Sequence, residues 1–251
     1  MNTIVDRFEK IKLNIASVKS DKPVNIIAVS KTFTLEHIQP LINYGHNHFG
    51  ENKVQEALAK WSVQKKENHN LKLHMIGKLQ SNKAKDAVRL FDYIHSVDNQ
   101  KLADALAKHQ KNINKNLKYF IQVNIGNEIQ KSGIPIGELD AFYNYCTNEI
   151  DLKIIGLMAI PPLNDNTEKY FKSLNQVNKS LALENLSMGM SADYLDAIKN
   201  GSNFVRIGSS IFGPRSWQRY YFLILLKLLW GELFLMQRNL QFFYNFFLRH
   251  V

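Results

Sequence analysis

Short apolar runs alternate with longer stretches in which apolar residues recur every three or four positions. The short runs, rich in β-branched residues, predict buried strands, and the longer stretches predict amphipathic helices. The predicted strands are residues 24–29, 47–50, 72–76, 93–97, 119–125, 153–159, 185–188 and 204–207. The predicted helices are residues 3–18, 34–43, 54–64, 83–90, 100–110, 136–145, 167–181 and 192–200.

The order of these segments predicts the fold class. Each strand is followed or preceded by a helix across a short connection, which is typical of a parallel sheet. Eight strands is also the number that closes a barrel. The sequence therefore favours a single α/β domain, a (β/α)8 TIM barrel, over an open doubly wound sheet. Thr34, three residues before His37, is placed to cap the second predicted helix.

The pattern stops near residue 216, which we take as the end of the barrel (residues 1–216). Residues 217–251, the C-terminal tail, hold eleven aromatic residues and show little regular alternation. Residues 220–236 are apolar, but a lysine, a glycine and a glutamate interrupt them, so they are marginal for a span of ~20 residues. A frameshift or read-through is the favoured interpretation of this atypical tail, and contact with a membrane is the alternative.

Composition narrows the classes of partner. The formal net charge is +10. Lysines such as Lys60 and Lys65 fall on predicted polar helix faces, and no basic tract is interleaved with aromatics, so nucleic acid is not an expected partner. Attraction for small anions, including phosphates, is the safer inference. A single cysteine, Cys146, excludes an internal disulfide, and the first residues begin no signal peptide, so we expect a cytoplasmic protein.

Lys31 is the first candidate for chemistry. It follows the first apolar run and Ser30, which places it at the C-terminal tip of a buried strand, the edge where α/β folds build their sites. A lysine beside apolar walls loses proton affinity, and its amine can then attack an aldehyde to form a Schiff base. On this residue alone, a strand-end lysine that simply reaches solvent remains the alternative.

The last two predicted strands are followed by residues suited to phosphate. Gly189, Gly208 and Ser209 lie where barrels commonly hold phosphate, after strands 7 and 8. Glycine permits close backbone approach, and serine hydroxyl and backbone N–H groups donate to phosphate oxygens. Arg206 adds a fixed charge with paired donors. Either loop alone would indicate ordinary turn glycines, but two at the expected place favour a phosphate site.

Other chemistries find less support. His46, His48 and His74 are dispersed, with one cysteine in the chain and no paired carboxylates nearby, so no metal site is expected. His48 and His74 lie within predicted strands and are interpreted as structural histidines. No Gly-x-Ser-x-Gly sequence occurs, so the sequence does not indicate a serine hydrolase.

Several stretches together resemble the pyridoxal phosphate (PLP) homeostasis protein family, PLP-binding proteins similar to the N-terminal domain of alanine racemase. The resemblance covers roughly residues 1–216 and implies a barrel of the fold-type III PLP class, with PLP as the cofactor. It also implies a role in intracellular PLP (vitamin B6) homeostasis. The motifs that carry it are VSKT (29–32), HFGEN (48–52), HMIGKLQSNK (74–83), KSG (131–133), GLMAI (156–160), LSMGMS (186–191) and VRIG (205–208).

The resemblance assigns roles to five residues. Lys31 matches the lysine that holds PLP as a Schiff base. Asn52 matches a polar contact beside the cofactor. Ser187, Gly208 and Ser209 match the cup that holds the phosphate.

Three further residues keep two interpretations each. Arg206 matches the family's arginine and faces either the phosphate or the pyridine nitrogen; at the nitrogen it would weaken the electron sink that most PLP chemistry needs. Met158 packs either against the cofactor ring or in the barrel core. Lys131 is either a second lysine near the site or a solvated loop lysine.

The family resemblance favours a PLP carrier without catalytic turnover. PLP-dependent enzymes are candidate recipients of the cofactor. A PLP-dependent amino-acid racemase or decarboxylase of fold-type III is the alternative, because the barrel is shared. Such enzymes bring a second, β-rich domain, and residues 217–251 are too few to build one, so no enzymatic activity is expected.

Overall fold

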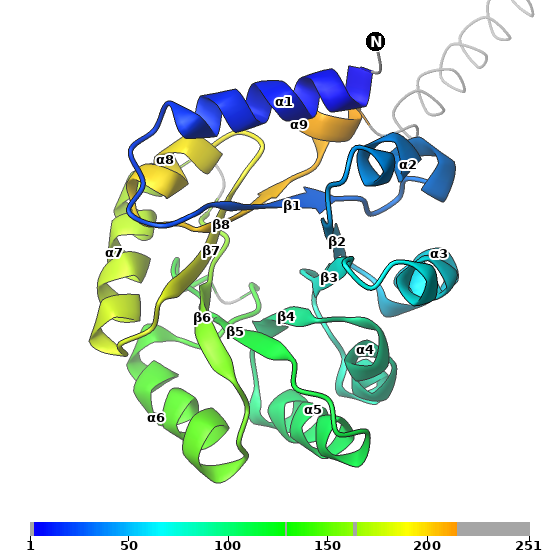
Figure 1. Ribbon diagram of the computed structural model, residues 1–251. Helices are drawn as coiled ribbons and strands as arrows, with labels where there is room; N and C mark the ends of the chain where they lie inside the picture. Colours follow the sequence, from blue (N-terminus) through cyan, green and yellow to red (C-terminus); the bar gives the residue numbers. More distant parts are fainter. Residues whose placement is uncertain (1–2, 129, 163–164, 215–251) are drawn as a thin grey trace, which may run out of the picture. The chain divides into compact units, whose positions relative to one another are not determined.

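The computed structural model describes residues 3–128, 130–162 and 165–214. Eight parallel strands close into a barrel in chain order, and helices surround it (Figure 1). The predicted (β/α)8 fold is therefore confirmed. The strands are β1 (Asn25–Val29), β2 (His48–Glu51), β3 (Lys72–Met75), β4 (Tyr93–Val97), β5 (Lys118–Gln122), β6 (Ile154–Met158), β7 (Asn185–Met190) and β8 (Phe204–Ile207).

The helices follow the predicted segments closely. Thr34 caps α2 as expected, since its side chain accepts a hydrogen bond from the His37 N–H. The α-helices are α1 (Thr3–Ala16), α2 (Leu35–Asn43), α3 (Val54–Glu67), α4 (Ala84–Leu90), α5 (Gln100–Asn112), α6 (Leu139–Asn144), α7 (Thr167–Ser180), α8 (Tyr194–Lys199) and α9 (Ser209–Phe212). Two 3-10 turns, η1 (Ser81–Lys83) and η2 (Ile136–Glu138), and a π-helical turn, η3 (Tyr145–Glu149), complete the described elements.

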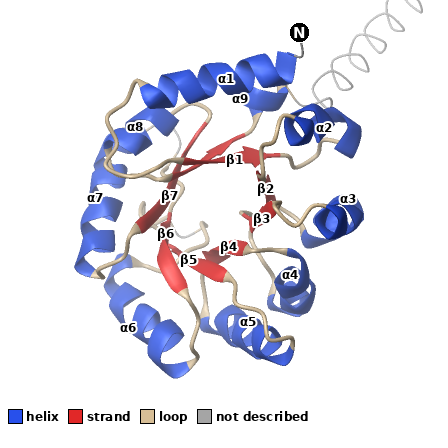
Figure 2. Ribbon diagram, viewed as in Figure 1, coloured by secondary structure: helices blue, strands red, loops and turns tan. Residues whose placement is uncertain are grey.

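Two apolar clusters form the core. The larger lies between the strands and the ring of helices that Figure 2 shows around the sheet. The smaller cluster contains strand residues alone and fills the barrel interior, as in other barrels of this kind. Its buried members are Ile27, Tyr93, Phe120, Met158 and Phe204.

The fifth strand is shorter than predicted. We predicted a strand to residue 125, but β5 ends at Gln122 because the chain turns at Asn124. The Asn124 side chain donates to the Glu128 carbonyl at 2.9 Å and accepts from the Glu128 N–H at 3.1 Å. This local pairing competes with the strand ladder. We also predicted one continuous helix over residues 136–145, whereas the structure has three consecutive helical segments there, η2, α6 and η3.

The barrel forms one compact unit, Met1–Gly213. The predicted boundary at residue 216 and both interpretations of residues 217–251 fall outside the described residues. Within the described ranges, no helix has the length and apolar character needed to cross a membrane.

Candidate functional site

Lys31 lies where the sequence placed it, directly after β1 at the carboxyl end of the strands. Its side chain is half-buried. Ser30, fully buried, donates its N–H to the Gly50 carbonyl at 3.0 Å, which ties the end of β1 to β2. The next residue, Thr32, has φ of 67°, a left-handed conformation that is strained for a β-branched side chain. Such strain is typical of functional sites and fixes the direction in which the chain leaves Lys31.

A buried charged network supports the segment before Lys31. Glu51 is fully buried, and its Oε1 accepts from the Ser30 hydroxyl at 2.8 Å, the Lys60 amine at 2.8 Å and the Trp61 indole N–H at 2.9 Å. Lys60 also donates to the Ser30 carbonyl at 2.8 Å. Both the side chain and the backbone of Ser30 are therefore held by one ion pair.

Two lysines that the sequence placed on polar helix faces take part in structure instead. The Lys60 side chain is 11% exposed and pairs with Glu51. Lys65 pairs with Asp92, and burial lowers the pKa of its amine. The interpretation of these two as surface lysines was wrong, because long lysine stems reach buried partners from a helix face.

Asn52 follows β2 and lies beside Lys31 at the same rim. The β1–β2 register pairs Val29 with Gly50, and two residues further along each chain stand Lys31 and Asn52. Asn52 is half-buried. A Cβ on Gly77, in the loop after β3, would lie 2.5 Å from the Asn52 carbonyl oxygen. Only glycine at position 77 lets the two loops approach this closely, which fixes the place of Asn52.

Arg206, on β8, is a buried cation inside the barrel. It is 5% exposed and donates to the Ser187 carbonyl at 2.6 Å, the Ser187 hydroxyl at 2.8 Å and the Ala159 carbonyl at 3.0 Å. Burial lowers its pKa to about 10, and the charge of Asp193 opposes that shift. Among the described residues no carboxylate forms an ion pair with Arg206. Its charge is therefore solvated by oxygen dipoles and not cancelled.

Ser187, Gly208 and Ser209 lie at two different depths. Ser187 is fully buried on β7, and its hydroxyl lies between Arg206 and His95. Gly208 is half-buried at the rim, Ser209 is exposed, and both follow β8. Ser187 and Arg206 are in contact inside the barrel. Gly208 and Ser209 instead follow β8 and lie at the carboxyl ends of the strands.

Ser191 is a rim residue at the end of the LSMGMS motif (186–191), and its sequence context alone suggested no role. Its hydroxyl accepts a hydrogen bond from the Gly208 N–H at 3.3 Å, which joins the loops after β7 and β8. Gly189, two residues earlier, has φ of +89°, and a Cβ there would lie 2.6 Å from Ala197 Cβ. Gly189 thus serves the packing of α8.

Comparison with known proteins identifies the family. Residues 7–216 match the family model described as alanine racemase, N-terminal domain. The pyridoxal phosphate homeostasis protein of Pasteurella multocida is 35% identical over 232 residues, which cover 86% of this chain and 100% of that protein. The protein of that name from Haemophilus influenzae is 37% identical over 209 residues, 79% of this chain and 88% of the relative. The chain belongs to the pyridoxal phosphate homeostasis protein family.

Solved structures agree with this family assignment. PipY of Synechococcus elongatus, solved with PLP bound, is 33% identical with a TM-score of 0.75, and the match covers 84% of this chain and all of PipY. An alanine racemase of Clostridium difficile is 12% identical with a TM-score of 0.63, and the match covers 56% of that chain. The second likeness shows a shared barrel fold.

Two residues left open by the family resemblance now have positions. Met158 is fully buried in the small interior cluster with Phe120. Lys131 pairs with Glu128 at 2.5 Å and donates to the Pro161 carbonyl at 3.2 Å, so it is a half-buried lysine that ties two rim loops together.

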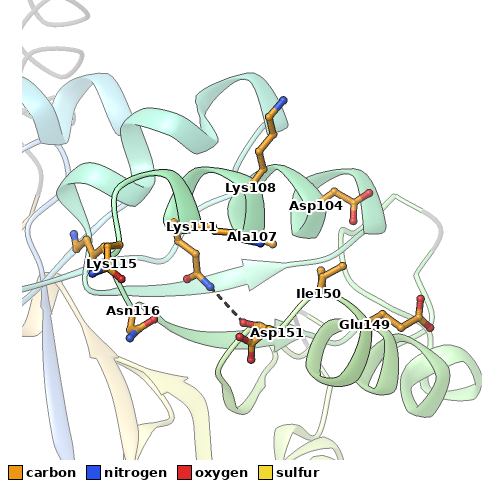
Figure 3. A pocket seen from close by; sticks show the side chains of 11 residues that line it. Asp104, Ala107, Lys108, Lys111, Lys115, Asn116, Glu149, Ile150 and Asp151 are labelled. Carbon is orange, nitrogen blue, oxygen red and sulfur yellow. Dashed lines mark hydrogen bonds between the residues drawn. The ribbon is translucent and has the colours of Figure 1, made fainter.

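Two cavities flank the helices outside this site. One, of about 620 Å³, lies between residues 32–36 and α3, where Lys60 lines it. The other, of about 550 Å³, is lined by α5 and by the segments that precede β5 and β6 (Figure 3). The Gln110 side-chain amide on α5 donates to the Asp151 carbonyl at 3.4 Å. This second cavity lies at the amino ends of the strands, opposite the rim that carries Lys31.

Proposed function

We propose that this protein binds PLP at the carboxyl end of its barrel and acts in intracellular PLP homeostasis, without catalytic turnover. One observation carries the proposal. A lysine at the end of β1 faces the same rim as a buried arginine on β8 that has no carboxylate partner among the described residues. An amine at the rim and an unneutralised cation buried below it suit a ligand with an aldehyde and a dianionic phosphate.

The described residues fit PLP group by group. When bound, PLP supplies an aldehyde that condenses reversibly with an amine, and the proposed amine is that of Lys31. The strained turn at Thr32 and the buried Glu51–Lys60 pair hold the Lys31 backbone in place. Asn52 offers a side-chain amide beside it.

The phosphate requires donors at the opposite side of the rim. Ser209 and Ser191 offer hydroxyl groups on the joined loops after β7 and β8, and Gly208, without a side chain, lets a phosphate approach the backbone. Ser187 lies deeper, where its hydroxyl contacts Arg206, so in this proposal it acts on the ligand through the arginine. Arg206 then attracts either the phosphate or the pyridine nitrogen, and comparison of PLP with pyridoxal separates the two.

The proposed role is to hold PLP and release it to PLP-dependent enzymes. The likeness to homeostasis proteins extends over the full length of the Pasteurella relative, whereas it extends over 56% of the racemase chain. That contrast supports a carrier over a racemase or decarboxylase.

A binding and turnover assay tests the proposal. The purified full-length protein is titrated with PLP, followed by absorbance, and then incubated with L-alanine and other amino acids. We expect saturable binding at one PLP per chain, and no racemised or decarboxylated product. Absence of PLP binding would contradict the binding role, and steady turnover of an amino acid would contradict the carrier role.

A further inference from the structure

A row of hydrogen-bonded side chains crosses the barrel interior, from β2 through β3 and β4 to β7 and β8. His48 Nδ1 lies 2.9 Å from His74 Nε2, and His74 Nδ1 lies 2.9 Å from His95 Nε2. His95 Nδ1 lies 2.9 Å from the Ser187 hydroxyl, which accepts from Arg206 at 2.8 Å. Because β4 and β7 are not neighbours in the sheet, the His95–Ser187 bond spans the interior. We call His48, His74 and His95 the histidine chain.

The hydrogen-bond network assigns a direction to every bond in this row. Arg206 can only donate, so the Ser187 oxygen accepts from it, and the hydroxyl hydrogen is available to His95 Nδ1. His95 then carries its hydrogen on Nε2 and donates to His74 Nδ1, and His74 donates in the same way to His48 Nδ1. The reverse direction would leave the hydrogen of the buried Ser187 hydroxyl without an acceptor among its described contacts, and it would place a second N–H beside the guanidinium. All donors therefore point away from Arg206.

The surroundings keep the histidine chain uncharged. His74 and His95 are fully buried, and burial, before any neighbouring charge, holds the pKa of each well below its usual value. The His74 ring stacks on Tyr93 with ring centroids 4.2 Å apart, and His95 stacks on Phe120 at 4.3 Å. Burial also lowers the pKa of His48. Each imidazole is thus a neutral dipole, and its electron-rich Nδ1 lies on the side of the row that leads to the arginine.

We propose that His95, supported by His74 and His48 and acting through Ser187, positions Arg206 and stabilises its charge without neutralising it. The inference rests on the proposed PLP site and names what keeps that site's arginine ready for a ligand. A carboxylate at the position of His95 would pair with the guanidinium and cancel the charge offered to the ligand. Aligned neutral dipoles stabilise a buried cation and leave its charge available. The three histidines are positioning residues.

A double-mutant cycle between His95 and Arg206 tests this coupling. His95→Phe keeps a ring that stacks on Phe120 but removes the acceptor for Ser187. We expect this variant to bind PLP about tenfold more weakly than the wild type, as one buried hydrogen-bond partner is lost. In an Arg206→Ala background the same change is expected to weaken PLP less than about twofold, because the arginine it serves is absent.

Ser187→Ala provides a second cycle with a smaller change, which keeps the test decisive if Arg206→Ala does not fold. His95→Phe added to Ser187→Ala is again expected to have little further effect. His95→Asn provides the rescue, because its Oδ1 lies near the position of Nδ1 and can accept from Ser187. Asparagine packs worse than phenylalanine beside Phe120, so stronger PLP binding by His95→Asn cannot arise from better packing.

His46→Phe is the matched control. His46 is a neighbouring histidine that lies outside the chain, and its Nε2 contacts the His48 carbonyl at 2.8 Å. We expect this variant to bind PLP as the wild type does. Wild-type binding in His95→Phe, or full additivity of its effect with Arg206→Ala, would overturn the inference while leaving the proposed PLP site intact. Failure of the wild-type protein to bind PLP would instead overturn the proposed function itself.

Discussion

The two sides of the proposed site are supported in opposite ways. Behind Lys31, a buried ion pair between Glu51 and Lys60 lies on the outer side of the barrel wall, where Lys60 binds the Ser30 carbonyl. Behind Arg206, neutral groups inside the barrel, namely Ser187 and the histidine chain, hold the side chain itself. A network that only fixes the backbone can therefore contain charges that cancel each other, whereas a network that presents a cation to a ligand must itself stay neutral.

We expect the largest loss of stability when the buried ion pair behind Lys31 is broken. Lys60→Met leaves the Glu51 carboxylate buried without its cation, and such a change typically costs about 3–5 kcal/mol of the free energy of unfolding. We expect that loss in urea denaturation, together with weaker PLP binding. Lys172→Met, which breaks an exposed pair with Glu168 at 2.7 Å, is the control and should leave the midpoint nearly unchanged. A similar small effect at Lys60 would show that the buried pair does not support the rim.

Acid destabilises a protein that keeps histidines buried and neutral, because those histidines are protonated on unfolding. Burial lowers the pKa of His46 to about 4, below its value of ~6.5 in the unfolded chain. The unfolded state therefore binds more protons between these values, and stability is lost as the pH falls from about 6.5 to about 4. At ~1.4 kcal/mol per unit, His46 accounts for about 3 kcal/mol of that loss.

Urea denaturation at pH 7 and pH 4 measures this contribution. His46→Phe should reduce the difference in the free energy of unfolding between the two pH values by about 3 kcal/mol. His69→Gln, at an exposed histidine, should leave the difference as it is. An unchanged difference in His46→Phe would mean that the folded protein does not hold this histidine neutral.

On the neutral side, Arg206→Ala removes the cation that the histidine chain supports. We expect PLP to bind more weakly by about 1.5–3 kcal/mol, or about tenfold to a hundredfold, with a much smaller effect on pyridoxal, which lacks the phosphate. Equilibrium titration with both ligands gives the comparison, and Arg89→Ala on the exposed face of α4 serves as the control. Equal weakening of PLP and pyridoxal would place the arginine at the ring nitrogen.

The smallest effect is expected from shortening the chain. A protein that ends at Ser216 keeps every residue of the proposed site, so it should bind PLP with unchanged affinity. It should also be at least as soluble, because the aromatic clusters after residue 216 have no partner face in the sequence pattern. Sedimentation and PLP titration of the two forms test this. Loss of folding in the shorter form would mean that the tail belongs to the barrel.

The sequence predicted the fold and the place of Lys31 because both depend on local pattern. Eight apolar runs with helices between them are enough to indicate a barrel, and the end of a run places a residue at the rim. The register shifts in β7–β8 and β4–β5 have no such local signal.

The two supporting networks escaped sequence analysis because they depend on closure of the barrel. Lys60 follows the spacing of a surface lysine, and only the approach of α3 to β2 shows its buried partner. His95 and Ser187 are 92 positions apart and meet across the interior. A histidine in each of three consecutive strands was the available signal, and we interpreted two of those histidines singly.

Borohydride trapping tests the central claim most directly. The full-length protein is loaded with PLP, reduced with borohydride, digested and mapped by mass spectrometry, alongside Lys31→Ala and the rim-lysine control Lys78→Ala. We predict one PLP adduct on the peptide that contains Lys31, its loss in Lys31→Ala and its retention in Lys78→Ala. An adduct on Lys83 or Lys131 in the wild-type protein, with none on Lys31, would contradict the account.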